Sequence, residues 1–469
     1  MSDSTLDFVF LQCLIAAAAF VFLLFRKQTA YLGITCLFVL NVASASLGAF
    51  FFGRLFGLRE QWISAEHETV FAYSGWMILA AVAAMWAAWS WLPSKEQRTE
   101  ARNGQKVREE SFPWLTAKFI YFCLGLGTLA SIAVPFVLHQ VATVGTAVNL
   151  MASWLKVGLI LSVVYFKIHR AFVPLAVALV LFVPAAIVGA LNSGHTPFAM
   201  DVLISIALIV ACLNRVTPMS FVKLFIWMVP CMYLMFGWMA SRNMIRSGDL
   251  DQFSIGERAS RFWDAFVYEL TQAEVTPYDI QNLLFDRIDM SDILAQETAF
   301  ETSASGEDQF AYGETLVDGA VDLVPRAIWE DKPTVAGYAD FVGRFTGTAR
   351  DDSTSIGVPV QFELYGNGGV PFVIVGVFVL TFLCARLERF IATTKRPLHV
   401  LMPAVMFLMP FSNGIEQIML VLSTAVAGAL TVYVIAKGIE IFFPQFLPEF
   451  RTYRRPRKLR AQGPVPATA

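Results

Sequence analysis

The chain has 469 residues, of which 56% are hydrophobic and only 15% are charged, and its mean hydropathy is +0.58. A soluble domain usually carries about 25% charged residues, so this composition indicates helices in contact with lipid. The formal net charge of −2 shows no acidic or basic excess and gives no argument for a nucleic-acid partner.

Runs of about 20 apolar residues, the length that crosses a bilayer, predict an all-α polytopic membrane protein with about eleven spanning helices. Residues 1–239 hold the first eight helices, 240–368 form a large loop, 369–443 hold the last three helices, and 444–469 form a basic tail. The predicted spans are Phe8–Phe25, Ala30–Phe56, Val70–Leu92, Thr116–Leu138, Val144–Phe166, Phe172–Leu191, Phe198–Leu213, Phe221–Met239, Val370–Phe390, Val400–Phe411 and Ile418–Phe443.

The lysines and arginines of the short loops predict the orientation, because cytoplasmic loops carry an excess of both. With the N-terminus outside, the cytoplasmic loops contain clusters such as Lys95 and Arg98, and the tail adds more. The short loops on the other side contain only Arg54 and Arg59. We therefore expect an inner-membrane protein with its N-terminus outside, its C-terminus in the cytoplasm and the large loop outside.

Two segments of the large loop have the apolar spacing of amphipathic helices. Gly256–Leu270 places Phe262, Phe266 and Leu270 at helical intervals, and Gln281–Leu294 has a similar pattern. Such helices can lie along the membrane surface.

Basic residues are the first functional signal in the loop. An arginine fork binds two phosphate oxygens and stays charged, so cations beside the headgroups suit a phosphorylated lipid. For any single arginine, a solvated loop of mixed charge is the simpler explanation. The nine basic residues are Arg242, Arg246, Arg258, Arg261, Arg287, Arg326, Lys332, Arg344 and Arg350.

The stretch Leu323–Pro333 brackets an arginine, a tryptophan and a lysine between two prolines. Prolines stiffen the backbone, and tryptophan suits a membrane interface. A rigid platform of this kind could present Arg326 and Lys332 to a pyrophosphate. An ordinary interfacial turn is the alternative.

A second stretch, Glu363–Gly369, leads directly into the ninth predicted span. Its carboxylate and amide could hydrogen-bond sugar hydroxyls, and the carboxylate could act as a base. Helix capping and a turn before the span, which the glycines permit, are the alternative.

Taken in order, P-R-A-I-W-E-D-K-P, S-T-S-I-G-V-P and E-L-Y-G-N-G-G resemble the motifs of Wzy-type O-antigen polymerases, bacterial oligosaccharide repeat-unit polymerases. The ten residues between Arg326 and Gly337 match the Arg-x10-Gly pattern of that family. The likeness covers roughly Leu316–Gly376. Gly368 stands where the family commonly has an aromatic residue.

The resemblance implies a GT-C-like bundle of the O-antigen ligase and polymerase type, and a glycosyltransferase that uses no nucleotide sugar. Its substrates would be oligosaccharide repeat units on undecaprenyl pyrophosphate, joined at the periplasmic face of the bacterial inner membrane. The product would be O-antigen, capsule or exopolysaccharide. A flippase and a chain-length regulator would be partners.

On this resemblance, the loop residues take two kinds of role. Glu363 is the first candidate for the catalytic base and Asp286 the second. No DxD or paired-ligand pattern occurs, so we predict neither a metal ion nor a cofactor. The substrate-binding candidates are Arg326, Lys332, Arg287, Arg258, Arg261, Arg344, Tyr365, Asn367 and Trp329.

Two other functions fit the same composition. An O-antigen ligase-like transferase would use the same lipid donor with a different acceptor, which the sequence does not show. A flippase for the lipid-linked oligosaccharide would typically have two related halves. The chain shows no internal repeat, which argues against the flippase.

Overall fold

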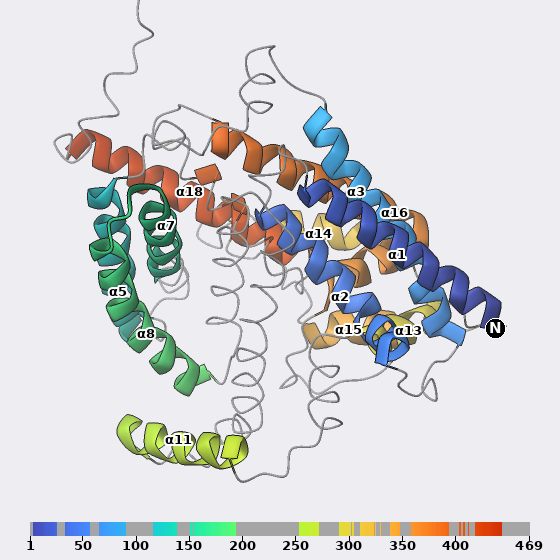
Figure 1. Ribbon diagram of the computed structural model, residues 1–469, viewed down its shortest axis with the longest axis horizontal. Helices are drawn as coiled ribbons and strands as arrows, with labels where there is room; N and C mark the ends of the chain where they lie inside the picture. The colour runs from blue at the N-terminus through green and yellow to red at the C-terminus, as the bar shows by residue number, and fades with distance from the viewer. Residues whose placement is uncertain are drawn as a thin grey trace, which may run out of the picture.

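The computed structural model shows a helical protein (Figure 1). No strand occurs among the residues that it describes, so the all-α part of the expected fold class is confirmed. The described residues are 3–25, 33–56, 65–90, 116–137, 151–152, 154–193, 253–271, 290–301, 303, 310–322, 324, 329, 338–347, 358–393, 403–404, 407–408, 411 and 418–442.

Most of the predicted apolar runs coincide with helices. The ninth run corresponds to the second part of α16 (Val360–Thr393). Two predicted spans, Phe198–Leu213 and Phe221–Met239, lie outside the described residues. The other helices that coincide with predicted spans are α1 (Asp3–Phe25), α2 (Gly33–Phe56), α3 (Ala65–Ser90), α5 (Ala117–Val137), α7 (Trp154–His169), α8 (Val173–Ser193) and α18 (Ile418–Phe442).

Within the described part of the chain, two helical stretches are long and apolar enough to cross a membrane, Glu66–Ala88 and Val360–Ile391. Several helices also carry large apolar side chains on their outer faces, among them Trp76 on α3, Val375 on α16 and Val434 on α18. Exposed apolar surface on many helices at once is typical of contact with lipid or with another apolar partner.

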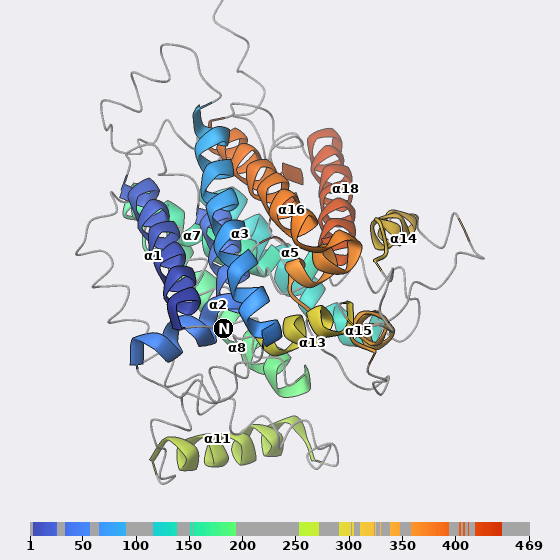
Figure 2. The same cartoon turned by 90° about the vertical axis from the view of Figure 1, so that its right-hand side faces the viewer.

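The helices pack into two groups with separate buried cores. In the first group, α3 packs against α1, α2 and α16, and Phe38, Phe71 and Phe362 are among its fully buried side chains. In the second group, α5, α7 and α8 surround Trp154 and Leu124. Figure 2 shows the first group beside α18 and the loop helices.

A glycine pair breaks α16 before its long apolar part. Gly369 has φ 65° and ψ −158°, a conformation that is open almost only to glycine. The break folds the two parts together, because a Cβ at Gly376 would lie 2.4 Å from the side chain of Leu364. In an unbroken helix, twelve residues would separate these positions by about 18 Å. The turn that was considered as an alternative before the ninth span is therefore present, and residues 360–367 form a short buried segment ahead of it.

Four helices come from the predicted loop: α11 (Ile255–Thr271), α13 (Ser291–Glu301), α14 (Glu314–Asp322) and α15 (Tyr338–Thr346). The helix α11 confirms the one predicted at Gly256–Leu270. The second predicted loop helix, Gln281–Leu294, overlaps α13 only at its end, and α13 continues to Glu301; residues 281–289 lie outside the described part.

The loop helices do not stay together. The helices α13, α14 and α15 lie against the first group, in contact with α2, α3, α16 and α18. The helix α11 lies apart from them in both views (Figures 1 and 2). The part of the loop that is next to the break in α16 is thus the part that can form a site with the bundle.

Candidate functional site

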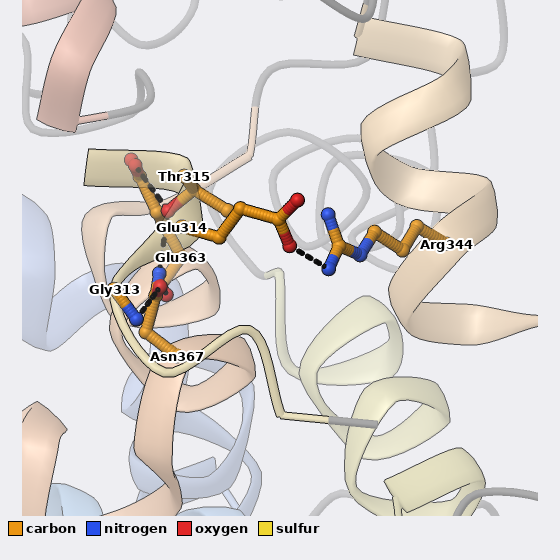
Figure 3. A network of polar contacts seen from close by, with 6 residues as sticks. All are labelled: Gly313, Glu314, Thr315, Arg344, Glu363 and Asn367. Atoms are coloured by element: carbon orange, nitrogen blue, oxygen red, sulfur yellow. Dashed lines mark hydrogen bonds and ion pairs between the residues drawn. The ribbon is translucent and has the colours of Figure 1, made fainter. Parts of the chain in front are cut away.

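Glu363 lies in the short segment before the break, beside Thr315 and Asn367 (Figure 3), and its carboxylate joins three helices. One oxygen accepts a hydrogen bond from the hydroxyl of Thr315 on α14 at 3.1 Å. The other accepts one from the backbone N–H of Ile418, where α18 begins. Glu363 is only 1% exposed. Its carboxylate therefore joins α14 and α18 to α16, and both of its oxygens already accept hydrogen bonds.

Asn367 completes this network one helical turn further on. Its side-chain amide donates to the hydroxyl of Thr315 at 2.6 Å and to the carbonyl of Glu363 at 2.7 Å. Its side-chain oxygen accepts from the N–H of Gly313 at 2.8 Å, just before α14. These contacts anchor α14 beside the break. The capping role considered for this stretch is therefore the one that its geometry supports.

The anchored helix α14 presents Glu314 to the solvent, next to the buried Thr315. Arg344 on α15 forms an ion pair with Glu314, as Figure 3 shows. Both side chains are well exposed, at 43% for Arg344 and 58% for Glu314. An exposed ion pair contributes little stability, so a phosphate could replace the Glu314 carboxylate at small cost. Arg344 is thus one predicted phosphate contact that the structure presents at the surface.

Two further carboxylates, Glu297 and Glu301, lie four residues apart on α13 and share one face of it. Glu297 is 0% exposed and Glu301 is 8% exposed. Neither carboxylate accepts a well-formed hydrogen bond from a described residue, although the backbone N–H of Gly366 lies close enough to Glu297 to favour its charged form. Buried carboxylates normally have such partners, so this pair is a candidate for a functional role.

Burial changes the acidity of both groups, because removal from water disfavours the charged form. It raises the pKa of Glu297 well above its ordinary value, and the charge of Glu301 adds to the effect while the backbone of Gly366 opposes it. It raises the pKa of Glu301 to about 7, although the positive charge of Arg344 acts in the opposite direction. Arg344 is therefore close enough to Glu301 to influence its ionisation.

Two tyrosines border the carboxylate pair. Tyr73 of α3 stacks on Tyr365 of α16, with ring centroids 5.6 Å apart. The hydroxyl of Tyr73 is buried and also lacks a hydrogen-bond partner in the described structure. A Cβ at Gly366 would lie 3.0 Å from a carboxylate oxygen of Glu297. The pair thus lies where α13 meets α3 and the short segment of α16.

Contacts at the start of α13 hold it in this place. The backbone N–H of Met290 donates to the carbonyl of Ala45 in α2 at 2.8 Å. The ring of His67, near the start of α3, lies 2.8 Å from the carboxylate of Asp292. The hydrogen bond with His67 holds the pKa of Asp292 below its usual value.

Of the residues predicted from the sequence, Glu363, Tyr365, Asn367 and Arg344 come together here. Sequence reasoning missed Glu297 and Glu301, since the predicted second loop helix stopped at Leu294. The only local signal for them was the spacing of two acids at four residues within an amphipathic stretch, which is common on solvated helices.

The other predicted residues do not join this group. Arg258 donates to the backbone carbonyl of Phe253 at 3.0 Å, and Arg261 lies over the ring of Phe253 at 3.9 Å. Both are on α11, away from α13 to α15. Trp329 is 42% exposed. The positions of Arg326, Lys332, Arg287 and Asp286 lie outside the described residues.

The described side chains include no group of three or more His, Cys, Asp or Glu residues placed to hold a metal ion. Comparison of the chain with protein-family models, curated protein sequences and solved structures finds no match. The chemistry of the site itself is therefore the basis for assigning a function.

Proposed function

We propose that this chain is a membrane glycosyltransferase that joins oligosaccharide repeat units carried on undecaprenyl pyrophosphate, as the Wzy-type polymerases that it resembles do. The observation that carries the proposal is the proximity of an exposed arginine, Arg344, to a desolvated acid, Glu301. Sugar transfer from a lipid pyrophosphate needs a cation for the departing group and a base for the acceptor hydroxyl. Arg344 and Glu301, on the contacting helices α15 and α13, would supply these two functions.

In the proposed reaction, a hydroxyl oxygen of the incoming repeat unit bonds to the anomeric carbon of the growing chain. The bond from that carbon to the pyrophosphate oxygen breaks, and the hydroxyl proton passes to the carboxylate of Glu301. A pKa of about 7 suits this role, because such an acid is partly ionised at neutral pH. Burial also raises the pKa of Glu297, on the same face of α13, which favours its protonated form.

The departing pyrophosphate receives its charge stabilisation from the loop. Arg344 exchanges the Glu314 carboxylate for phosphate oxygens, and its planar fork suits two of them. Arg326 and Lys332 remain predicted contacts for the same group. The network of Glu363 and Asn367 takes no part in the bond changes and positions α14, and with it Glu314, beside Arg344.

The proposal includes the eleven-helix topology in the bacterial inner membrane, with a periplasmic N-terminus and a cytoplasmic C-terminus. The N–H and hydroxyl of Thr35 both donate to Glu388, at 3.0 and 2.8 Å, so α2 begins where α16 ends. His67 meets Asp292 near the start of α3. If successive helices cross the membrane in opposite directions, the start of α3 lies on the same side as the N-terminus. Its contact with α13 then supports a loop on that side of the membrane.

Complementation of a deletion strain tests the function. We expect the deletion to accumulate single lipid-linked repeat units, and the wild-type gene to restore long polymer. At equal protein level, Arg344→Gln and Glu301→Gln should leave single repeats, and Arg344→Lys should give shortened chains because it keeps the charge but loses the fork. Lys118→Gln, which removes an exposed cation on α5, is the matched control and should restore full length.

Two other outcomes would replace the proposal. Finished polymer that accumulates on its carrier lipid in the deletion strain would identify a ligase. The absence of any repeat unit from the periplasm would identify a flippase. A flippase and a chain-length regulator are expected partners of the polymerase, so the strain must retain both.

A further inference from the structure

A cavity of about 520 Å³ lies beside the end of α16 that is remote from Glu363. Its walls are apolar side chains from three segments: Leu383 and Leu387 of α16, Phe407 and Phe411, and Leu422 of α18. The volume is within the range of about 300–1,000 Å³ that is usual for ligand pockets. The lining is suited to a hydrocarbon chain.

One charged side chain, Arg386, belongs to the wall that is otherwise apolar. Its Nη1 atom is buried and has no hydrogen-bond partner among the described residues. The nearby carboxylate of Glu388 accepts two hydrogen bonds from Thr35 on α2, and Arg389 adds a second buried positive charge. A buried guanidinium nitrogen without an acceptor is costly. The cavity therefore combines an apolar wall with a positively charged group that has room for an anionic acceptor.

We propose that this cavity binds one anionic phospholipid, with its phosphate on Arg386 and an acyl chain along Leu383, Leu387 and Phe407. A guanidinium fork matches two phosphate oxygens. Arg386 lies close to the end of the apolar stretch Val360–Ile391, at the level expected for the headgroups. Basic pockets between membrane helices are known to hold anionic headgroups.

The bound lipid would support the helix that organises the candidate site. It fills the space between α16, α18 and the side chains of Phe407, Leu408 and Phe411, and α16 carries the Glu363 network at its other end. A ligand that binds only the folded state raises its stability. The site is independent of the glycosyltransferase proposal, because it requires no sugar substrate.

Native mass spectrometry of the purified full chain in detergent tests the site. The probes are phosphatidylglycerol and phosphatidylethanolamine with identical acyl chains, each titrated separately. Both lipids carry the phosphate, but the ammonium of phosphatidylethanolamine is repelled by Arg386 and Arg389, so we expect one phosphatidylglycerol to bind about tenfold more tightly. Arg386→Gln should abolish this preference, so that the two lipids bind about equally. Lys118→Gln, an exposed cation on α5, should leave it unchanged.

A second variant separates lipid binding from misfolding. Ala404→Phe fills part of the cavity and keeps Arg386, so it should weaken both lipids about equally. A phosphatidylglycerol with a photoreactive group in its acyl chain should label peptides that contain Leu383 or Phe407. Equal binding of the two lipids by the wild type, or labelling that Arg386→Gln leaves unchanged, would overturn the proposal and leave only bulk lipid at this surface.

Discussion

Two buried carboxylates on neighbouring elements, Glu363 and Glu297, have opposite surroundings. Glu363 accepts hydrogen bonds on both oxygens, from Thr315 and from the backbone of Ile418. Glu297 is equally buried, but it accepts no well-formed hydrogen bond from a described residue, and the backbone of Gly366 only partly favours its charged form. A buried carboxylate without partners is unfavourable and takes up a proton instead. The two residues therefore have the same chemistry in the sequence and different roles in the fold.

This contrast separates the residues that build the region from those that can act in it. A saturated carboxylate cannot accept a further proton or a sugar hydroxyl without losing a structural contact. The oxygens of Glu301, at the edge of the pair, are also buried, but they accept no hydrogen bond from a described residue, and the pKa of this carboxyl is raised. Glu301 on α13 is therefore a better candidate for the base of the proposed reaction than Glu363, which was predicted from the sequence.

The largest effect is expected from Glu363→Ala, because it leaves the Thr315 hydroxyl and the Ile418 N–H without an acceptor. Each such orphaned donor costs about 1–3 kcal/mol, so we expect a loss of about 2–6 kcal/mol. The midpoint of thermal unfolding, followed by tryptophan fluorescence in detergent, measures this loss. An unchanged midpoint would show that Glu363 has no structural role.

Gly369→Ala should have the next largest effect, because it places a Cβ at φ 65° and ψ −158°. Backbone strain of this kind costs about 1–3 kcal/mol. Gly438→Ala is the control, since Gly438 lies in α18 and a Cβ there meets nothing within 4 Å. The control should be neutral or slightly stabilising in the same unfolding measurement. Equal effects of the two variants would show that the break in α16 is not required.

Substitution of Glu301 in the acidic pair should raise the free energy of unfolding, whereas Glu363→Ala and Gly369→Ala should lower it. The pKa of Glu301 is raised from 4.5 to about 7, so the folded state keeps a proton that the unfolded chain releases. Its contribution is complete below pH 4.5 and is lost as the pH rises towards 7. Glu301→Gln removes this loss. We expect the variant to be about 1–2 kcal/mol more stable than wild type at pH 8, allowing for solvent screening, and equal to it at pH 4.5.

If Glu301→Gln stabilises the protein and also abolishes polymer, Glu301 is a group that is kept for function at a cost in stability, unlike Glu363. Unfolding midpoints of the two proteins at pH 4.5 and 8 provide the test. If Glu301→Gln instead destabilises the protein at both pH values, the carboxylate has a structural partner like that of Glu363.

The features that the sequence predicted are those with local signals. Apolar runs predicted helices where α1, α3, α5 and α18 lie, and the glycines Gly368 and Gly369 permitted the turn that was considered as an alternative. The role of Glu363 had no local signal, because its partners lie 48 and 55 residues away.

The acidic pair was hidden for the same reason. Glu297 and Glu301 have the spacing of ordinary surface acids, and only the packing of α13 against α2, α3, α15 and α16 makes them buried. Arg344 was recognisable by residue type, since exposed loop cations suit a phosphate wherever the loop folds. Burial is a tertiary property, so a residue whose function depends on desolvation is difficult to predict from a single sequence.

The smallest effect on stability is expected from Arg344→Gln. Its ion pair with Glu314 is exposed on both sides, and such pairs contribute about 0–1 kcal/mol. The unfolding midpoint should therefore remain close to that of wild type, whereas polymer should be lost. Arg344→Lys, which keeps the charge, should match wild type in stability and recover part of the chain length. If Arg344→Gln instead lowers the midpoint as far as Glu363→Ala, the arginine belongs to the saturated framework, and its loss of polymer follows from misfolding of α15.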